Sequence, residues 1–310
     1  MSGALEGRNV DGLRRFLFEN VPLRGFWLRL EHSWAAALEH QSYPDPVRRL
    51  LGESLAAVAL LAASLKFQGT LVLQINGSGP VRLLVAQATH ELAVRGVARF
   101  EAPGDPPDAA PGFRALVGDN ARLTVTMEGT DRVAAWQGIV PLAGDSLADS
   151  LEAYFATSEQ IPTRVVLAAD AHRVAGVLLQ KLPTPSKDAG EASEGRIREL
   201  WDEAALLLQT VHAEELLRVA PEVLLPRVFT GHDLRLFESH PVRFQCRCSP
   251  ERVASLLRSL GEAEVRDVLA ERGDVVVTCE FCQRPYRFDA IDVERLFAAR
   301  PGNGGSSTVN

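Results

Sequence analysis

The sequence predicts an α+β fold in three parts: an N-terminal sheet domain with covering helices, a helical linker region and a small C-terminal domain. Two observations support this division. Strand-like and helix-like segments mix up to residue 183 without a repeated strand–helix–strand rhythm, which favours an antiparallel or mixed sheet covered by helices. Residues 182–195 are rich in proline, serine, glycine and charge, as linkers are. We therefore place the domains at residues 1–181, 182–241 and 242–298, followed by a disordered tail at 299–310.

The composition is that of an ordinary globular protein. Hydrophobic residues make up 46% of the 310 residues and charged residues 24%, so the chain is long enough for about two domains with a sizeable core. The formal net charge of −7 argues against a general nucleic-acid binder, because phosphate contacts require a basic face. We therefore expect no nucleic-acid partner.

The first half of the chain carries clear helix and strand patterns. A mostly apolar helix is expected at residues 50–66. Thr70–Ile75 then alternates leucine and isoleucine with other residues, the period-two pattern of a half-buried strand. Turn residues at 76–80 separate it from a second strand at residues 81–86, so a hairpin is predicted. Further strands are expected at residues 91–100, 122–127, 163–169 and 174–180.

The longest apolar run, Leu55–Leu65, is too short to span a membrane. A spanning helix needs roughly 20 apolar residues, and Lys66 closes this run, so we expect a buried helix and no membrane partner. The first 16 residues hold no apolar segment behind a basic start and do not resemble a secretory signal. We therefore expect the protein in the cytosol, where thiols stay reduced.

Ser146 admits two interpretations. It precedes a predicted helix at residues 147–157, whose first amides its hydroxyl can cap. Residues 144–147 also spell Gly-Asp-Ser-Leu, the motif of a hydrolase family with a serine nucleophile. Such a serine needs a general base, and no histidine here has an aspartate three residues before it. We favour the cap and expect no catalytic residues; the phosphate-binding motif of ATPases is also missing from the sequence.

Residues 197–219 are predicted to form one long helix after the linker. Its apolar stripe contains Trp201, Leu207, Leu208 and Val211. This stripe is wider than a solvent-exposed helix requires, so we expect it to dock on another part of the protein. Prolines at 221 and 226 end the helical pattern.

The C-terminal domain has well-specified local structure. Ser249 and Pro250 mark the start of a helix that ends at Gly261. A second helix is expected at residues 262–272. Two strands should flank the turn at residues 279–282, and a closing helix should follow at 291–297.

All four cysteines of the chain lie in this domain, as the pairs Cys246 and Cys248, and Cys279 and Cys282. Isolated buried cysteines would not form two local pairs. A thioredoxin-like redox site would place Cys-x-x-Cys at the start of a helix, whereas the second pair lies between two strand-like runs. Four thiolates on two rigid turns suit a Zn²⁺ site, and this is the interpretation that we favour.

Such a site would make the C-terminal domain depend on its metal. A domain of about 55 residues has a small core, and structural zinc contributes roughly 10–16 kcal/mol of folding free energy. His240 is a possible substitute ligand, although four cysteines leave it more simply explained as a surface histidine. Nearby arginines could offset the negative charge of the site: Arg247, Arg252, Arg284 and Arg287.

Taken together, these segments resemble the heat-shock protein 33 family of redox-regulated chaperones. The resemblance runs in order from about Arg14 to Phe297, and the Cys-x-Cys plus Cys-x-x-Cys pairing in this context is highly specific. It rests on the segments LLGESLAAVALLAASLKFQGTLVLQINGSGPVRLLV, RGVAR, WQGIVPL, YFATSEQIPT, GVLLQKLP, FQCRCSPERV and VTCEFCQRPYRFDAIDVERLF.

The resemblance implies an ATP-independent holdase of the bacterial cytosol. In the reduced, inactive state one Zn²⁺ would be held by Cys246, Cys248, Cys279 and Cys282. Oxidation would turn these cysteines into two disulfides, release the zinc, unfold the linker region and yield a homodimer that binds unfolding client proteins. We expect each disulfide to form within its local pair. Gln283 stands where the family more often has asparagine, a departure that does not affect ligation.

Two questions remain open. The resemblance does not give the client-binding surface; our hypothesis is that Trp201, Leu207, Leu208 and Val211 pack on the N-terminal sheet at rest and bind clients once released. The alternative is that this helix is ordinary core. The arginines of the C-terminal domain also allow a nucleic-acid-reading ribbon, which the acidity of the chain disfavours.

Overall fold

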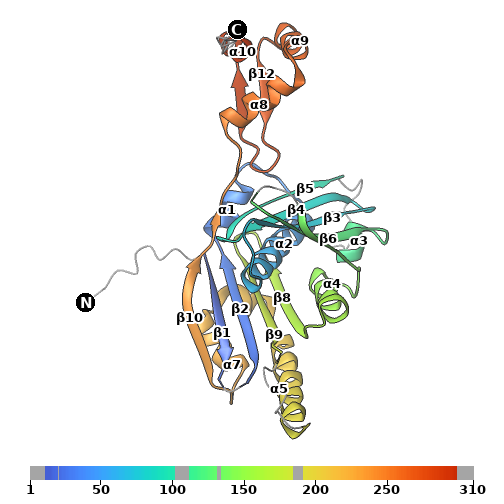
Figure 1. Ribbon diagram of the computed structural model, residues 1–310, viewed down its shortest axis with the longest axis vertical. Helices are drawn as coiled ribbons and strands as arrows, with labels where there is room; N and C mark the ends of the chain where they lie inside the picture. The colour runs from blue at the N-terminus through green and yellow to red at the C-terminus, as the bar shows by residue number, and fades with distance from the viewer. Residues whose placement is uncertain (1–10, 20, 102–111, 131–133, 184–190, 299–310) are drawn as a thin grey trace, which may run out of the picture. The chain divides into compact units, whose positions relative to one another are not determined.

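A computed structural model describes residues 11–19, 21–101, 112–130, 134–183 and 191–298 (Figure 1). The chain forms two compact units, Met1–Gln245 and Cys246–Asn310. In the described residues, the first unit contains two sheets with their helices and the second a hairpin with three helices. The α+β class is confirmed. The predicted tail at 299–310 lies outside the described residues.

Sheet A of the first unit is antiparallel throughout. Its strands lie in the order β10 (Leu234–Pro241), β1 (Gly12–Phe18), β2 (Leu23–Leu30), β9 (Val174–Lys181) and β8 (Thr163–Ala169). Sequence analysis did not predict β1 and β2. In β2 nearly every residue is buried, because this sheet is covered on both faces, and such a strand has no period-two pattern.

Sheet B has six strands and contains the predicted hairpin. They lie in the order β11 (Arg243–Phe244), β5 (Ala93–Phe100), β4 (Val81–Thr89), β3 (Thr70–Asn76), β6 (Arg122–Glu128) and β7 (Ala134–Val140). The two-residue β11 pairs parallel with β5, and the other pairs are antiparallel. A side chain at Gly77, in the hairpin turn, would collide with the Val81 carbonyl oxygen, so the turn requires glycine there.

The main core surrounds helix α2 (Asp45–Ser64), which lies between the two sheets (Figure 1). Leu55, Val58 and Leu60 are at most 1% exposed, as expected for a helix that is apolar on all sides. Shorter helices complete this layer: α1 (His32–Leu38), α3 (Phe113–Val117) and α4 (Leu147–Tyr154), which continues as the π-helical turn η1 (Phe155–Glu159). No helix in the described residues is long and apolar enough to cross a bilayer.

The other face of sheet A carries three helices in sequence, α5 (Glu191–Gln209), α6 (Ala213–Arg218) and α7 (Pro221–Val228). Their buried residues Leu208, Leu216 and Leu224 pack in one cluster with Phe16 and Trp27 of the sheet. The helices and this face of sheet A form a second apolar layer. This layer explains why the apolar stripe predicted at residues 197–219 is so wide.

The predicted single helix at residues 197–219 is wrong in extent. Helix α5 ends at Gln209, and α6 starts after His212 in a capping box in which His212 and Glu215 satisfy each other's backbone amides. This local capping competes with a continuous helix. Val211 therefore lies between the two helices, although it is buried in the same cluster.

The segment predicted as a helical linker also differs in its last part. Residues 234–241 form strand β10, which pairs with β1 at the edge of sheet A. An edge strand that is exposed along most of its length carries no clear apolar alternation. Helix α5 begins at Glu191, inside the expected linker at 182–195, and residues 184–190 lie outside the described residues.

The second unit follows its predicted elements closely. Helix α8 spans Pro250–Leu260 and α9 spans Glu262–Arg272. The hairpin of β12 (Val275–Thr278) and β13 (Pro285–Phe288) follows, and α10 (Ala290–Phe297) ends the described chain. Local caps specify these elements, since the Ser249 hydroxyl accepts from the Arg252 amide and Asp289 forms a capping box with Asp292.

Candidate metal centre

The four cysteines lie on two bends of the second unit. Cys246 and Cys248 belong to the extended segment that leads into α8, and Cys279 and Cys282 lie in the turn between β12 and β13. The hairpin brings the second pair into one turn, and the path through α8 and α9 returns the chain to the first pair. The fold thus gathers side chains that are more than 30 residues apart.

The four sulfur atoms form one cluster. The Sγ atoms of Cys246 and Cys279 lie 3.6 Å apart, those of Cys248 and Cys282 lie 3.4 Å apart, and all four lie within 4.8 Å of one another. All four are free thiols and half-buried. Zn–S bonds of about 2.3 Å in a tetrahedron place the sulfurs about 3.8 Å apart, so this cluster could hold a metal ion of that kind.

The thiols differ in their acidity. Burial raises the pKa of Cys246, and it raises the pKa of Cys282 to about 12. Burial also acts against ionisation of Cys248, but hydrogen bonds from the Tyr286 hydroxyl and the neighbouring thiols outweigh it and lower the pKa of Cys248 to about 7. The raised pKa values of Cys246 and Cys282 disfavour four thiolates in the absence of a cation, and a bound cation would favour their deprotonation.

Tyr286 was not predicted as part of this site. It lies on β13, is 9% exposed, and its hydroxyl contacts the Cys248 thiol, which raises the pKa of Tyr286 to about 12. The only signal in the sequence is the alternation along Pro285–Phe288, in which Tyr286 faces the core between exposed neighbours. Its contact depends on the hairpin and could not be read from spacing alone.

The turn that carries the second pair is closed by backbone hydrogen bonds. The Gln283 amide donates to the Cys279 carbonyl at 2.7 Å, and the Cys279 amide donates to the Arg284 carbonyl at 3.0 Å. Gln283 has φ 53°, a left-handed conformation in which asparagine is several-fold enriched. The glutamine that stands here in place of asparagine therefore bears on the backbone conformation of the turn.

Two of the arginines predicted to offset the site's charge have local partners. Arg252 donates to the Arg247 carbonyl at 2.6 Å, which supports the segment that carries the first cysteine pair. Arg287 pairs with Asp274 across the hairpin at 2.8 Å. Both contacts stabilise the cysteine-bearing segments from outside the sulfur cluster.

Comparison with known proteins assigns the chain to a family. The family model described as "Hsp33 protein" matches residues 11–289. The chain belongs to the Hsp33 family. The 33 kDa chaperonin of Azotobacter vinelandii is 45% identical over 302 residues, 97% of this chain and 99% of that protein. That of Methylobacillus flagellatus is 42% identical over 297 residues, 94% of this chain and 97% of that protein.

The fold agrees with a solved Hsp33 structure. The crystal structure of the 33 kDa chaperonin from Thermotoga maritima superposes with a TM-score of 0.75 at 23% identity, covering 92% of this chain and 97% of that one. The family is one of chaperones and not of enzymes. This assignment argues against the hydrolase interpretation of Ser146. The Ser146 hydroxyl instead caps α4, where it accepts a hydrogen bond from the Asp149 amide at 3.0 Å.

The other predicted residues of this Hsp33 chain take separate places. His240 is exposed on β10, opposite Leu13 in the sheet, and the cysteine cluster does not include it. Leu208 is 1% exposed and Val211 8%, while Trp201 and Leu207 are half-buried at the edge of the same cluster against sheet A. The stripe is therefore packed on the sheet, which both the client-binding hypothesis and the ordinary-core alternative predict.

Proposed function

We propose that this protein is a redox-regulated, ATP-independent holdase that binds unfolding client proteins. The observation that carries the proposal is the cluster of four thiols within 4.8 Å of one another, in a chain that belongs to a chaperone family. In the reduced state the protein holds one Zn²⁺ and is inactive. Oxidation of the four cysteines switches it on.

Cys246, Cys248, Cys279 and Cys282 are the residues that would hold the zinc. When bound, the ion supplies folding free energy of roughly 10–16 kcal/mol. The second unit has few other sources of stability, since its buried core consists of Val253, Leu257, Val265, Val275, Tyr286, Val293 and Leu296. Loss of the metal should therefore unfold this unit.

Oxidation would join the cysteines in two local disulfides. Each disulfide forms with loss of two electrons and two protons from a pair of thiols, and one molecule of hydrogen peroxide accepts them and becomes two waters. We propose the pairs Cys246 with Cys248 and Cys279 with Cys282. A thiol consumed in this way no longer ligates zinc, so the metal leaves.

The helices on sheet A are the proposed mobile segment. Arg29 of the sheet donates to the Leu217 and Val219 carbonyls of α6 and its C-cap at 3.4 and 3.5 Å, distances that mark weak hydrogen bonds. Among the described residues, Trp27 Nε1 and Arg29 Nε are buried without a partner. Each unpaired buried donor costs about 1–3 kcal/mol, which lowers the free energy needed to release the helices.

Release of α5–α7 would uncover apolar side chains on these helices and on sheet A. Trp201, Leu207, Leu208 and Val211 are the proposed client-binding residues on the helices. The resemblance further suggests that the active form is a homodimer in the cytosol. We also propose the domain boundaries predicted from the sequence pattern, residues 1–181, 182–241 and 242–298.

The deciding experiment follows the aggregation of a chemically unfolded client by light scattering. The protein is added either reduced and zinc-loaded or treated with peroxide at mild heat, and a colorimetric chelator records released zinc. Suppression of aggregation only by the treated protein, together with zinc release, supports the switch. If neither form suppresses aggregation while zinc stays bound, the cysteine cluster is a structural site.

A further inference from the structure

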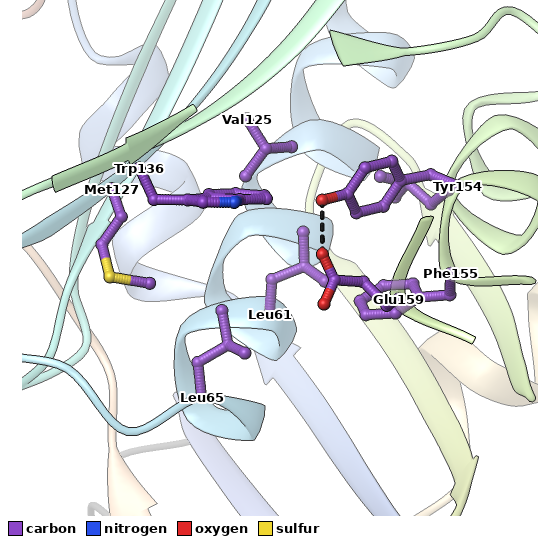
Figure 2. A pocket seen from close by; sticks show the side chains of 9 residues that line it. Leu61, Leu65, Val125, Met127, Trp136, Tyr154, Phe155 and Glu159 are labelled. Carbon is purple, nitrogen blue, oxygen red and sulfur yellow. Dashed lines mark hydrogen bonds between the residues drawn. The ribbon is translucent and has the colours of Figure 1, made fainter. Parts of the chain in front are cut away.

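A cavity of about 220 Å³ lies between α2, sheet B and α4 (Figure 2). Aromatic rings form much of its wall: Trp136 from β7, and Tyr154 and Phe155 from the junction of α4 and η1. Leu61 of α2 and Leu65, the C-cap residue just after it, line the side below the rings in this view. The cavity is smaller than the 300–1,000 Å³ of drug-sized ligand sites, and its size suits a single large side chain.

Glu159 carries the only charge among the nine residues that line the cavity. Its Oε1 accepts a hydrogen bond from the Tyr154 hydroxyl at 2.6 Å, and Glu159 as a residue is exposed to solvent. Burial and this hydrogen bond raise the pKa of Tyr154, so the hydroxyl stays a donor. The apolar cavity therefore has a fixed negative charge at its mouth.

The cavity adjoins the free edge of a sheet. Strand β7 is the last strand of sheet B, where it pairs with β6 and with no other described strand. Its side chains are unusually apolar for an edge, since Trp136 is 37% and Ile139 65% exposed. Natural proteins normally protect such edges with charges or proline, and none stands within Ala134–Val140.

The segment that holds Glu159 has an uncommon backbone. Residues 155–159 form a π-helical turn, and Gln160 ends it at φ 54°. A regular α-helix would rotate Glu159 away from its present place beside Tyr154. Single π-turns of this kind are rare and frequently lie at functional sites.

We propose that β7 and this cavity together bind an extended segment of an unfolded client protein. The segment adds a strand to the edge of β7, places one large apolar side chain in the cavity, and pairs a lysine or arginine two residues away with Glu159. Residues two apart on a strand point to the same face. The basic side chain of the client segment therefore lies on the same side as the apolar one and can reach Glu159 beside the cavity. The inference rests on the holdase function proposed above and assigns a second contact for the same client.

Unfolded polypeptide fits this place better than other occupants. It has unpaired backbone groups, which an edge strand can bind, and exposed apolar side chains, for which the adjacent cavity provides selectivity. The single carboxylate selects for basic neighbours. A contact with one side chain is weak by itself, and it gains strength when a second surface on the same protein binds the same client.

The test uses a labelled peptide with Phe-Thr-Arg between serine and threonine residues, and a matched peptide with Phe-Thr-Glu. Fluorescence anisotropy measures their binding to the full-length, reduced, zinc-loaded protein, in which β7 is exposed while the helix surface stays packed on sheet A. The edge contact alone is too weak to make this form a holdase. We expect the arginine peptide to bind about two- to fivefold more tightly, as for an exposed ion pair. Glu159→Gln keeps the acceptor for Tyr154 and should abolish this difference, whereas Glu264→Gln, an exposed carboxylate on α9, should leave it unchanged.

Two further variants test the cavity itself. Trp136→Ala should weaken both peptides about tenfold, as loss of an aromatic anchor does, and Trp136→Phe should restore most of the binding. Circular dichroism confirms that each variant is folded. Equal binding of both peptides to the unaltered protein, or unchanged binding by Trp136→Ala, would overturn the proposal. A concentration-dependent dimer of the reduced protein that Trp136→Ala dissolves would also overturn it, by assigning the edge to a second copy.

The result separates this inference from the holdase proposal. If the oxidised protein suppresses aggregation but the peptides do not discriminate, the edge site is wrong and the holdase function stands. If the peptides bind with the expected pattern and neither form suppresses aggregation, the edge site stands and the redox-switched holdase is wrong.

Discussion

The Sγ atoms of Cys248 and Cys282 lie 3.4 Å apart, although 34 residues separate them in the chain. Helices α8 and α9 and strand β12 occupy the intervening chain. Any ion bound at the sulfurs therefore connects the first and last parts of the second unit. The stability of that unit should depend on the metal more than on its small core.

Removal of zinc should unfold the second unit and leave the first one folded. With a strong chelator under reducing conditions, we expect hydrogen exchange in α8–α10 to lose its protection, because the remaining core is small. All four tryptophans belong to the first unit, so their fluorescence should stay constant as long as α5, which carries Trp201, remains docked on sheet A without oxidation. Added Zn²⁺ should restore protection, and protection that survives the chelator would contradict a structural role of the metal.

Peroxide treatment should produce two local disulfides. Proteolysis without reduction followed by mass spectrometry should find Cys246 joined to Cys248 and Cys279 joined to Cys282. A bridge between Cys246 and Cys282 would overturn this pairing. Cys279→Ser should lose zinc binding and leave one unpaired cysteine, while Ser259→Ala on α8 serves as a control outside the site.

Leu206 and Leu208 on α5 offer a matched test of the client surface. Leu208 is 1% exposed and Leu206 is 65% exposed. Leu208→Asp buries a charge against sheet A and should weaken helix docking by about 3 kcal/mol or more. We expect it to raise client binding without oxidant, measured by light scattering, and Leu206→Asp to leave binding unchanged. Unchanged binding by Leu208→Asp would make this helix ordinary core.

Glu53 on α2 should give the first unit a pH-dependent stability. Burial raises the pKa of Glu53 from 4.5 to about 7, so the folded state holds a proton that the unfolded state releases at lower pH. The free energy of unfolding should therefore fall by about 1–3 kcal/mol as the pH rises from about 4.5 to about 7, and then level off.

Chemical denaturation monitored by tryptophan fluorescence measures this dependence. Glu53→Gln should be more stable than the unaltered protein above pH 7 and should lose the slope below it. Glu39→Gln, whose side chain is 69% exposed, should keep the slope. A slope that persists in Glu53→Gln would assign it to another group.

Ser146→Ala should destabilise the first unit without any effect on catalysis. The lost cap of α4 costs about 1 kcal/mol, which thermal denaturation can detect. We expect no hydrolysis of a p-nitrophenyl ester by either protein. Turnover that disappears in Ser146→Ala would restore the hydrolase interpretation.

Much of the fold was predictable where local signals agree. The hairpin at residues 70–86 and the helix at 250–260 have period, turn and capping residues in their own sequence, and both were predicted. The predictions failed where contacts with neighbouring elements decide the secondary structure. Strand β2 is buried on both faces, β10 is an exposed edge, and α5 ends early because His212 and Glu215 cap a new helix.

For the site, the sequence by itself determined which residues matter: two tight pairs of cysteines are chemically recognisable without coordinates, because a ligand pair on one turn needs only local spacing. Tertiary structure alone decided that the four sulfurs meet, that Tyr286 contacts Cys248, and that Trp136 and Glu159 share a cavity. These pairs are far apart or on different elements, and their contacts depend on how sheets and helices pack, which short-range patterns do not encode.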